Sequence, residues 1–282
     1  MRYHETQLTT ADGLKLYAQA WQPDTAPKAY VTLVHGLGEH SGRYAHVAAH
    51  LAAHGYATHT FDLRGHGKSP GQPRGYVNSF DDYVTDAEAL VKSVQVAAGR
   101  PIFLMGHSMG GAIATLYVMT RQPNQVGGAV NGLILSSAAL KLADDVPPIL
   151  IKLSGVISKL APTLATMKIN PETISRDPEI VNKAGNDPLC HYGGTRARTG
   201  AELVRAINLI AAGAGSITLP IYLFHGTVDK LTNPEGSKQV YAKVASADKT
   251  LKLYEGAYHE TLNDICKAEV LTDLTAWLDA RS

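Results

Sequence analysis

Residues 101–120, PIFLMGHSMGGAIATLYVMT, constrain the fold more than any other stretch, because they predict a buried strand, a sharp turn and a helix in immediate succession. Ser108 lies at the apex of the turn, between Gly106 and Gly110, in the pattern G-x-S-x-G. Glycines at these two positions leave room for a strained backbone that lifts the serine hydroxyl above the edge of a sheet. A chance Gly-Ser-Gly turn would lack the apolar run before it and the helical run after it. Ser108 is therefore the candidate nucleophile.

The chain around this stretch alternates between strand and helix patterns, which is typical of a mostly parallel α/β sheet. An opening hairpin is expected over residues 3–20, with its turn at 11–13. A strong amphipathic helix is expected over residues 79–98. Further strands are predicted at 29–34, 55–61, 102–105, 133–135, 221–224 and 249–254.

Between residues 138 and 216 the alternation stops, and several helical patterns are separated by turn residues. We interpret 138–216 as a cap inserted into a core formed by 1–137 and 217–282. The first cap helix, expected over 148–161, has apolar residues on one face: Ile149, Leu150, Leu153, Val156, Ile157 and Leu160. Two interpretations of this face remain open, packing against the protein's own core and contact with lipid.

Two polar loops follow the last two predicted strands and contain the candidate partners of Ser108. Asp229 lies in the loop after 221–224, and His259 lies in the loop after 249–254. Loops at the carboxyl ends of parallel strands share one edge of the sheet, so both side chains can converge on the serine. His259 is the only histidine after Asp229. Asp144 and Asp145 are alternative acids, but they fall inside the predicted cap.

These residue types suit nucleophilic catalysis. A serine hydroxyl attacks poorly until an imidazole accepts its proton, and a carboxylate fixes the tautomer of that imidazole. The backbone N–H of Met109, at the predicted helix start, would form half of an oxyanion hole. The loop after strand 29–34, His35-Gly36-Leu37-Gly38, is of the kind that supplies the second donor, and we assign it to the N–H of Leu37.

Composition excludes several other classes of protein. The 282 residues are 45% hydrophobic with a net charge of +1, so nothing favours binding to nucleic acid. The histidines at 46, 50 and 54 share one predicted helix face but lack a carboxylate or cysteine partner, which favours a solvated helix edge over a metal site. Cys190 and Cys266 have no metal-binding or redox spacing, and free thiols are the expected state. We expect neither a metal nor another cofactor.

The sequence also predicts where the protein is found. The first ten residues lack the apolar segment of a signal peptide, and no apolar run approaches the about 18 residues of a membrane span. We therefore expect a cytoplasmic protein that can contact a membrane or micelle transiently through its cap.

Several motifs together resemble the monoacylglycerol lipase family of the α/β-hydrolases. They are HGLGEHSGRY at 35–44, FDLRGHGKS at 61–69, GHSMGG at 106–111, NDPLC at 186–190 and KTLKLYEGAYHE at 249–260. The resemblance implies an α/β-hydrolase fold, with an eight-stranded, mostly parallel sheet and a cap that forms a lid over an acyl tunnel. It also matches Ser108, Asp229 and His259 to the catalytic triad, and Leu37 and Met109 to the oxyanion hole.

The same resemblance places Glu39 and Arg43 in a polar patch near the glycerol end of a substrate. A mutual i, i+4 ion pair that shapes the loop is an equally good explanation of these two residues. The chain departs from the animal members of the family at Leu262, where they have a second histidine.

The expected activity is hydrolysis of monoacylglycerols to fatty acid and glycerol through an acyl-enzyme, with a small lipid ester as the substrate. A lysophospholipase or a general carboxylesterase would have the same triad and is the alternative. A catalytically inactive binding protein of this fold would normally lack a triad residue, and all three are present. The oligomeric state is left open.

Overall fold

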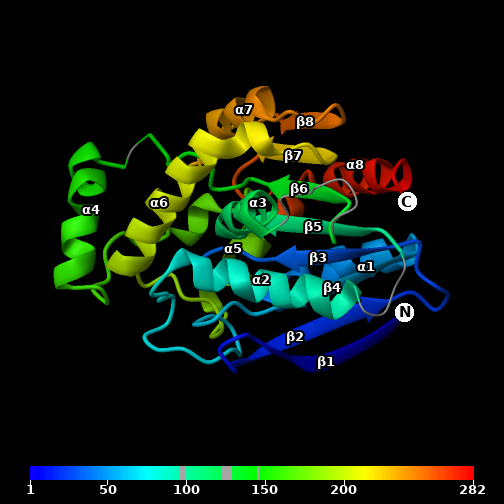
Figure 1. Cartoon of the computed structure of the whole chain (residues 1–282), viewed down its shortest axis with the longest axis horizontal. Helices are drawn as coiled ribbons and strands as arrows, with labels where there is room; N and C mark the ends of the chain where they lie inside the picture. The colour runs from blue at the N-terminus through cyan, green and yellow to red at the C-terminus, as the bar shows by residue number, and fades with distance from the viewer. Residues whose placement is uncertain (96–99, 122–128, 145) are drawn as a thin grey trace.

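The computed structural model describes residues 1–95, 100–121, 129–144 and 146–282. Its centre is an eight-stranded sheet in the order β1-β2-β4-β3-β5-β6-β7-β8, in which β1 and β2 pair antiparallel, as do β2 and β4, while all other neighbours are parallel (Figure 1). The strands are β1 (Arg2–Thr9), β2 (Lys15–Gln22), β3 (Ala29–Val34), β4 (Tyr56–Phe61), β5 (Ile102–His107), β6 (Gly132–Ser136), β7 (Ile221–Gly226) and β8 (Lys249–Tyr254). The predicted α/β fold with a mostly parallel sheet is confirmed.

Helices cover both faces of this sheet, which explains why its central strands are continuous runs of buried residues. On one face α2 (Phe80–Gln95), α3 (Met109–Arg121) and α7 (Pro234–Lys243) contribute to one large apolar core. On the other face α1 (Ala45–Ala53) and α8 (Lys267–Asp279) form a second core around Phe103, Phe224 and Trp277. A short 3-10 helix, η1 (Ser41–Tyr44), precedes α1. Residues 96–99 of the expected helix 79–98 lie outside the described residues.

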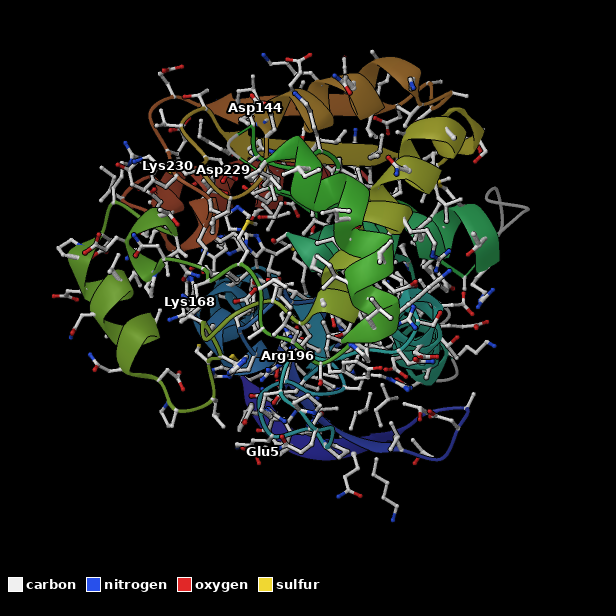
Figure 2. The ribbon with its side chains drawn as sticks, turned by 90° about the vertical axis from the view of Figure 1, so that its left-hand side faces the viewer. Glu5, Asp144, Lys168, Arg196, Asp229 and Lys230 are labelled. Atoms are coloured by element: carbon white, nitrogen blue, oxygen red, sulfur yellow. The ribbon has the colours of Figure 1, made fainter. Side chains whose placement is uncertain are left out.

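The segment between β6 and β7 contains α4 (Pro148–Leu160), α5 (Pro178–Asn186) and α6 (Ala197–Gly213). In Figure 1, α4 lies at the end of the molecule opposite both chain termini, with α6 between α4 and the sheet. Helix α6 packs against both α4 and α3. Seen from that end, in Figure 2, α4 crosses in front of α6, and the label of Asp229 lies to the left of α4. The division into a core and a cap at residues 138 and 216 stays a prediction.

The apolar residues of α4 divide between the solvent and the cavity. Four of its apolar residues, spaced by whole turns, are exposed: Ile149, Leu153, Val156 and Leu160. Ile157, which we grouped with them, instead lines the internal cavity beside Ser154, and Ser158 is buried. The side chain of Leu150 lies outside the described residues. The helical pattern left both interpretations of this face open, because it cannot distinguish an apolar side chain that meets the interior from one that meets the surroundings.

Candidate active site

The turn between β5 and α3 presents Ser108 as the sequence predicts. Ser108 has a φ of 53°, in the left-handed region that non-glycine residues seldom adopt. A Cβ atom at Gly106 would lie 2.2 Å from the carbonyl oxygen of Gly110, and a Cβ at Gly110 would lie 2.1 Å from that of Val34. Only glycine fits at these two positions, so the backbone of α3 can start directly against β3 and β5.

The loop after β3 lies against this turn. A Cβ atom at Gly36 would lie 3.0 Å from the Cβ of Ser108, so the two backbones are close. The N–H of Gly36 donates to Glu39 Oε1 at 2.6 Å, and the Tyr44 hydroxyl donates to the same oxygen at 2.8 Å. Glu39 therefore fixes the loop beside the serine.

The two amides expected to form the oxyanion hole both come from this region. Leu37 follows Gly36 in the loop, and Met109 is the first residue of α3. Neither backbone N–H donates to another residue in the part of the chain that the structure describes. Both are therefore available to a bound group.

Asp229 and His259 meet because β7 and β8 are parallel neighbours. His259 Nδ1 lies 2.7 Å from Asp229 Oδ2. The other carboxylate oxygen, Oδ1, accepts from the backbone N–H groups of Leu231 at 2.7 Å and Thr232 at 3.0 Å. These contacts hold the carboxylate in one orientation towards the imidazole.

The environment sets the charge of each group. Burial acts to raise the pKa of Asp229, but the two neighbouring imidazoles and their hydrogen bonds outweigh it and keep the pKa well below its usual range. Burial acts to lower the pKa of His259, but Asp229 raises it overall. His107, whose ring centroid lies 4.8 Å from that of His259, has its pKa lowered to about 3 by burial and by the charge of His259. His107 therefore stays neutral beside a histidine that can become charged.

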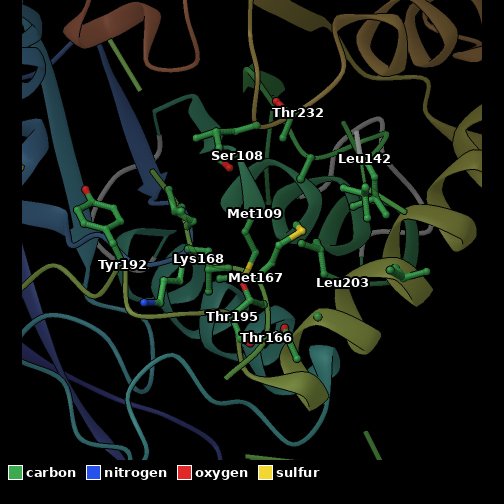
Figure 3. A pocket seen from close by; sticks show the side chains of 18 of the residues that line it. Ser108, Met109, Leu142, Thr166, Met167, Lys168, Tyr192, Thr195, Leu203 and Thr232 are labelled. Atoms are coloured by element: carbon green, nitrogen blue, oxygen red, sulfur yellow. Dashed lines mark hydrogen bonds between the residues drawn. The ribbon is translucent and has the colours of Figure 1, made fainter. Parts of the chain in front are cut away.

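Ser108 and His259 open onto one cavity of about 590 Å³. Most of its lining is apolar and includes Leu142, Leu164, Met167, Leu203 and Val204. In Figure 3, Tyr192 and Leu203 lie on opposite sides of the cavity, with Ser108 and Met109 between them. A cavity of this size and polarity suits a long apolar ligand.

A buried charge cluster adjoins the cavity. Arg43 donates to both oxygens of Glu260, at 2.5 and 2.7 Å, and to Glu39 Oε2 at 3.1 Å. Glu39 and Glu260 line the cavity, while Arg43 is not among its lining residues. Burial acts to raise the pKa of Glu39, but the charge of Arg43 and the hydrogen bond from the Gly36 N–H lower it overall, whereas burial raises the pKa of Glu260. The i, i+4 pair of Glu39 and Arg43 exists. Glu260, the last residue of the motif at 249–260, joins it, although the sequence analysis assigned that residue no role.

The alternative acids and metal ligands fall elsewhere. Asp144 is exposed and pairs with Lys141 at 3.2 Å, and Asp145 lies outside the described residues. The histidines at 46, 50 and 54 contact three separate acceptors, Leu262 O, Thr275 Oγ1 and His50 O.

Among the described residues, one group could offer ligands to a metal ion, namely His40, Asp187 and Cys190, with their ligand atoms within 4.8 Å of one another. His40 Nε2 lies 3.0 Å from Asp187 Oδ2, and His40 Nδ1 accepts from the N–H of Gly42. Both ring nitrogens are therefore engaged, and the neutral tautomer keeps its proton on Nε2. This arrangement ties the loop of Glu39 to the end of α5.

Comparison with known proteins places the chain in a family. The family described as serine aminopeptidase, S33, matches residues 25–265. The chain belongs to this family of hydrolases. Within the family it is similar to a monoacylglycerol lipase of Mycolicibacterium smegmatis, with 36% identity over 94% of this chain and 93% of that protein. It is also similar to the human monoglyceride lipase, with 33% identity over 98% of this chain and 90% of that protein.

Solved structures agree with these relatives. A monoacylglycerol lipase from Paleococcus ferrophilus superposes on this hydrolase with a TM-score of 0.85 and 32% identity, over 95% of this chain and 99% of that one. The resemblance that the motifs indicated, to the monoacylglycerol lipase family of the α/β-hydrolases, is confirmed.

Proposed function

We propose that this hydrolase cleaves monoacylglycerols to a fatty acid and glycerol, with Ser108 as the nucleophile. The observation that carries the proposal is the cavity itself, whose lining combines Ser108 and His259 with a largely apolar chamber and with the carboxylate residues Glu39 and Glu260. The apolar chamber suits one acyl chain, and the polar end suits a hydroxylated alcohol. The similarity to monoacylglycerol lipases supports the same substrate class.

The proposed mechanism follows from the protonation states. Ionised Asp229 can only accept hydrogen bonds, so His259 carries its proton on Nδ1 and presents Nε2 as the base. His259 takes the proton of Ser108 as the serine oxygen attacks the ester carbonyl. The N–H groups of Leu37 and Met109 stabilise the tetrahedral oxyanion, each contributing roughly 3 kcal/mol to the lowering of the barrier. His259 then protonates the departing glycerol, and water repeats the sequence on the acyl-enzyme.

Glu39 and Arg43 have different proposed roles at the polar end. Glu39 faces the cavity, where its carboxylate can accept a hydrogen bond from a glycerol hydroxyl while it fixes Gly36. Arg43 acts behind it, since its guanidinium joins Glu39 to Glu260. Together they would orient the alcohol part of the substrate.

Transient contact with lipid aggregates is proposed for the outer face of α4. Exposed apolar side chains on α4 continue to Leu164 and Met167, and the latter two also line the cavity. Lipid drawn from an aggregate would therefore meet an apolar path to Ser108. Among the described residues, no helix is both long and apolar enough to cross a membrane.

A substrate panel tests the proposed function. The panel compares a monoacylglycerol, the methyl ester of the same fatty acid, the matching lysophosphatidylcholine and an aminoacyl p-nitroanilide. We expect the highest kcat/KM for the monoacylglycerol and no cleavage of the anilide. Equal rates on monoacylglycerol and methyl ester would indicate a general carboxylesterase, a preference for the phospholipid would indicate a lysophospholipase, and a preference for the anilide would indicate a peptidase. Each of these would contradict the proposal.

A further inference from the structure

A second, fully buried histidine contacts the carboxylate of Asp229. His225, in β7, has no exposed surface, and its Nε2 lies 2.9 Å from Asp229 Oδ2. This is the same oxygen that His259 Nδ1 approaches at 2.7 Å. Two imidazoles therefore share one carboxylate oxygen, and only one of them adjoins the cavity.

The tautomer of His225 follows from its contacts. An ionised carboxylate can only accept, so Nε2 of His225 must carry the proton that it shares with Asp229. The neutral ring then has a lone pair on Nδ1, which lies 2.8 Å from the hydroxyl of Ser237, a buried residue of α7. The Ser237 hydroxyl donates to Nδ1 and so favours the Nε2–H tautomer. A chain of hydrogen bonds runs from α7 through β7 to the triad.

We propose that His225 is a positioning residue for the hydrolysis reaction, which acts by holding Asp229 and by taking up part of its negative charge. The inference rests on the proposed role of Asp229 and His259. A carboxylate with one fewer donor is freer to rotate away from His259, and its charge interacts more strongly with the donor that remains. Without His225, we expect a less well-placed base that also holds its proton more tightly.

The charges around His259 determine the direction in which its pKa should change when His225 is replaced. Asp229, Glu260 and Glu39 favour the imidazolium, while the ring of His107 stays neutral beside it. Of these three carboxylates, Asp229 is the one that contacts His225. The uncharged hydroxyl of Thr232 also donates to Asp229 Oδ2, at 2.9 Å, and would remain in the absence of His225. Loss of the His225 N–H should therefore raise the pKa of His259, and the rise of kcat/KM with pH should move to higher pH.

The experiment compares His225→Leu with His225→Gln. Glutamine can donate its amide N–H to Asp229 and accept from Ser237, whereas leucine can do neither. We expect His225→Leu to lower kcat by roughly tenfold to a hundredfold with little change in KM, and to move the pH midpoint of kcat/KM up by about half a unit to one unit. His225→Gln should restore most of the lost kcat and return the pH midpoint of kcat/KM close to that of the unmodified protein. The control is His59→Leu in β4, which removes a partly buried imidazole away from the site and should leave the pH midpoint unchanged.

A measurement independent of activity covers the case in which His225→Leu does not fold. Two-dimensional ¹H–¹⁵N spectra of the imidazole groups in the unmodified protein should show neutral His225 with its proton on Nε2, and Ser237→Ala should weaken the protection of that proton from exchange. A proton on Nδ1, an unchanged pH midpoint in His225→Leu, or failure of glutamine to restore kcat would each overturn the proposal. If Asp229→Asn keeps full activity, the proposed triad itself fails, which is a separate result.

Discussion

The turn at Ser108 and the helix α4 show two opposite ways of building one catalytic cavity. At the turn the backbones of β3, β5 and α3 are so close that no Cβ fits at Gly106 or Gly110, and Ser108 adopts a positive φ. In α4, Gly155 has open space around it, and apolar side chains such as Val156 are exposed. Steric exclusion determines the conformation of the turn, whereas α4 leaves apolar side chains exposed on its outer face.

This difference indicates how the two parts of the cavity serve the reaction. Hydrolysis needs the serine, the imidazole and the oxyanion donors held within a fraction of an ångström, which a tightly packed backbone supplies. Entry of a lipid needs an apolar surface that can meet an aggregate, which a packed core cannot offer. We therefore expect the same substitution to have opposite effects in the two places.

Glycine to alanine gives the largest expected contrast. Gly110→Ala should destabilise the protein by roughly 3 kcal/mol or more and abolish activity, because the new methyl group would overlap the carbonyl of Val34. Gly155→Ala, also within a helix, should stabilise it by about 0.5 to 1 kcal/mol, since alanine favours helix and meets nothing. Thermal and urea unfolding of the two variants, with hydrolysis of a soluble ester, measures both effects. Similar unfolding curves for the two would contradict the contrast.

A smaller effect is expected from the exposed face of α4. Replacing Leu153 and Val156 by serine should lower hydrolysis of dispersed long-chain monoacylglycerol by about tenfold, because less apolar area is available to meet the aggregate. Hydrolysis of a soluble short-chain ester and the Tm should stay close to those of the unmodified protein. Ile265→Ser, at an exposed apolar residue outside the cap, is the matched control and should alter neither rate. Equal losses on both substrates would mean that this face serves folding instead.

The sequence was sufficient wherever a local pattern or the parallel topology determines position. The G-x-S-x-G pattern predicts the turn at Ser108 directly. Asp229 and His259 follow neighbouring parallel strands, and the carboxyl ends of such strands lie at one edge of the sheet. Neither inference needs a distance between side chains. For the same reason the strand pattern and the sheet class agreed with the structure.

Side-chain contacts between elements that are distant in the sequence could not be predicted, because no motif or periodicity links them. His225 meets Ser237 only because α7 packs on β7, and Glu260 meets Arg43 only because the loop after β8 lies beside η1. Whether Ile157 lines the cavity depends on how α4 is placed over it, and the helical periodicity of the sequence carries no information on that placement. Such pairs depend on the packing of distant segments, and the relevant signal exists only in three dimensions.

The central claim is that Ser108 forms the acyl-enzyme, and covalent labelling tests it most directly. The protein is treated with a fluorophosphonate, whose phosphonyl group bonds to an activated serine oxygen as the P–F bond breaks and fluoride leaves. The modified peptide is then identified by mass spectrometry. We predict one equivalent of label on Ser108. In Ser108→Ala both labelling and monoacylglycerol hydrolysis should be lost, while the variant still unfolds cooperatively with a Tm close to that of the unmodified protein. Stoichiometric label on another serine, or continued labelling and hydrolysis by Ser108→Ala, would contradict the account.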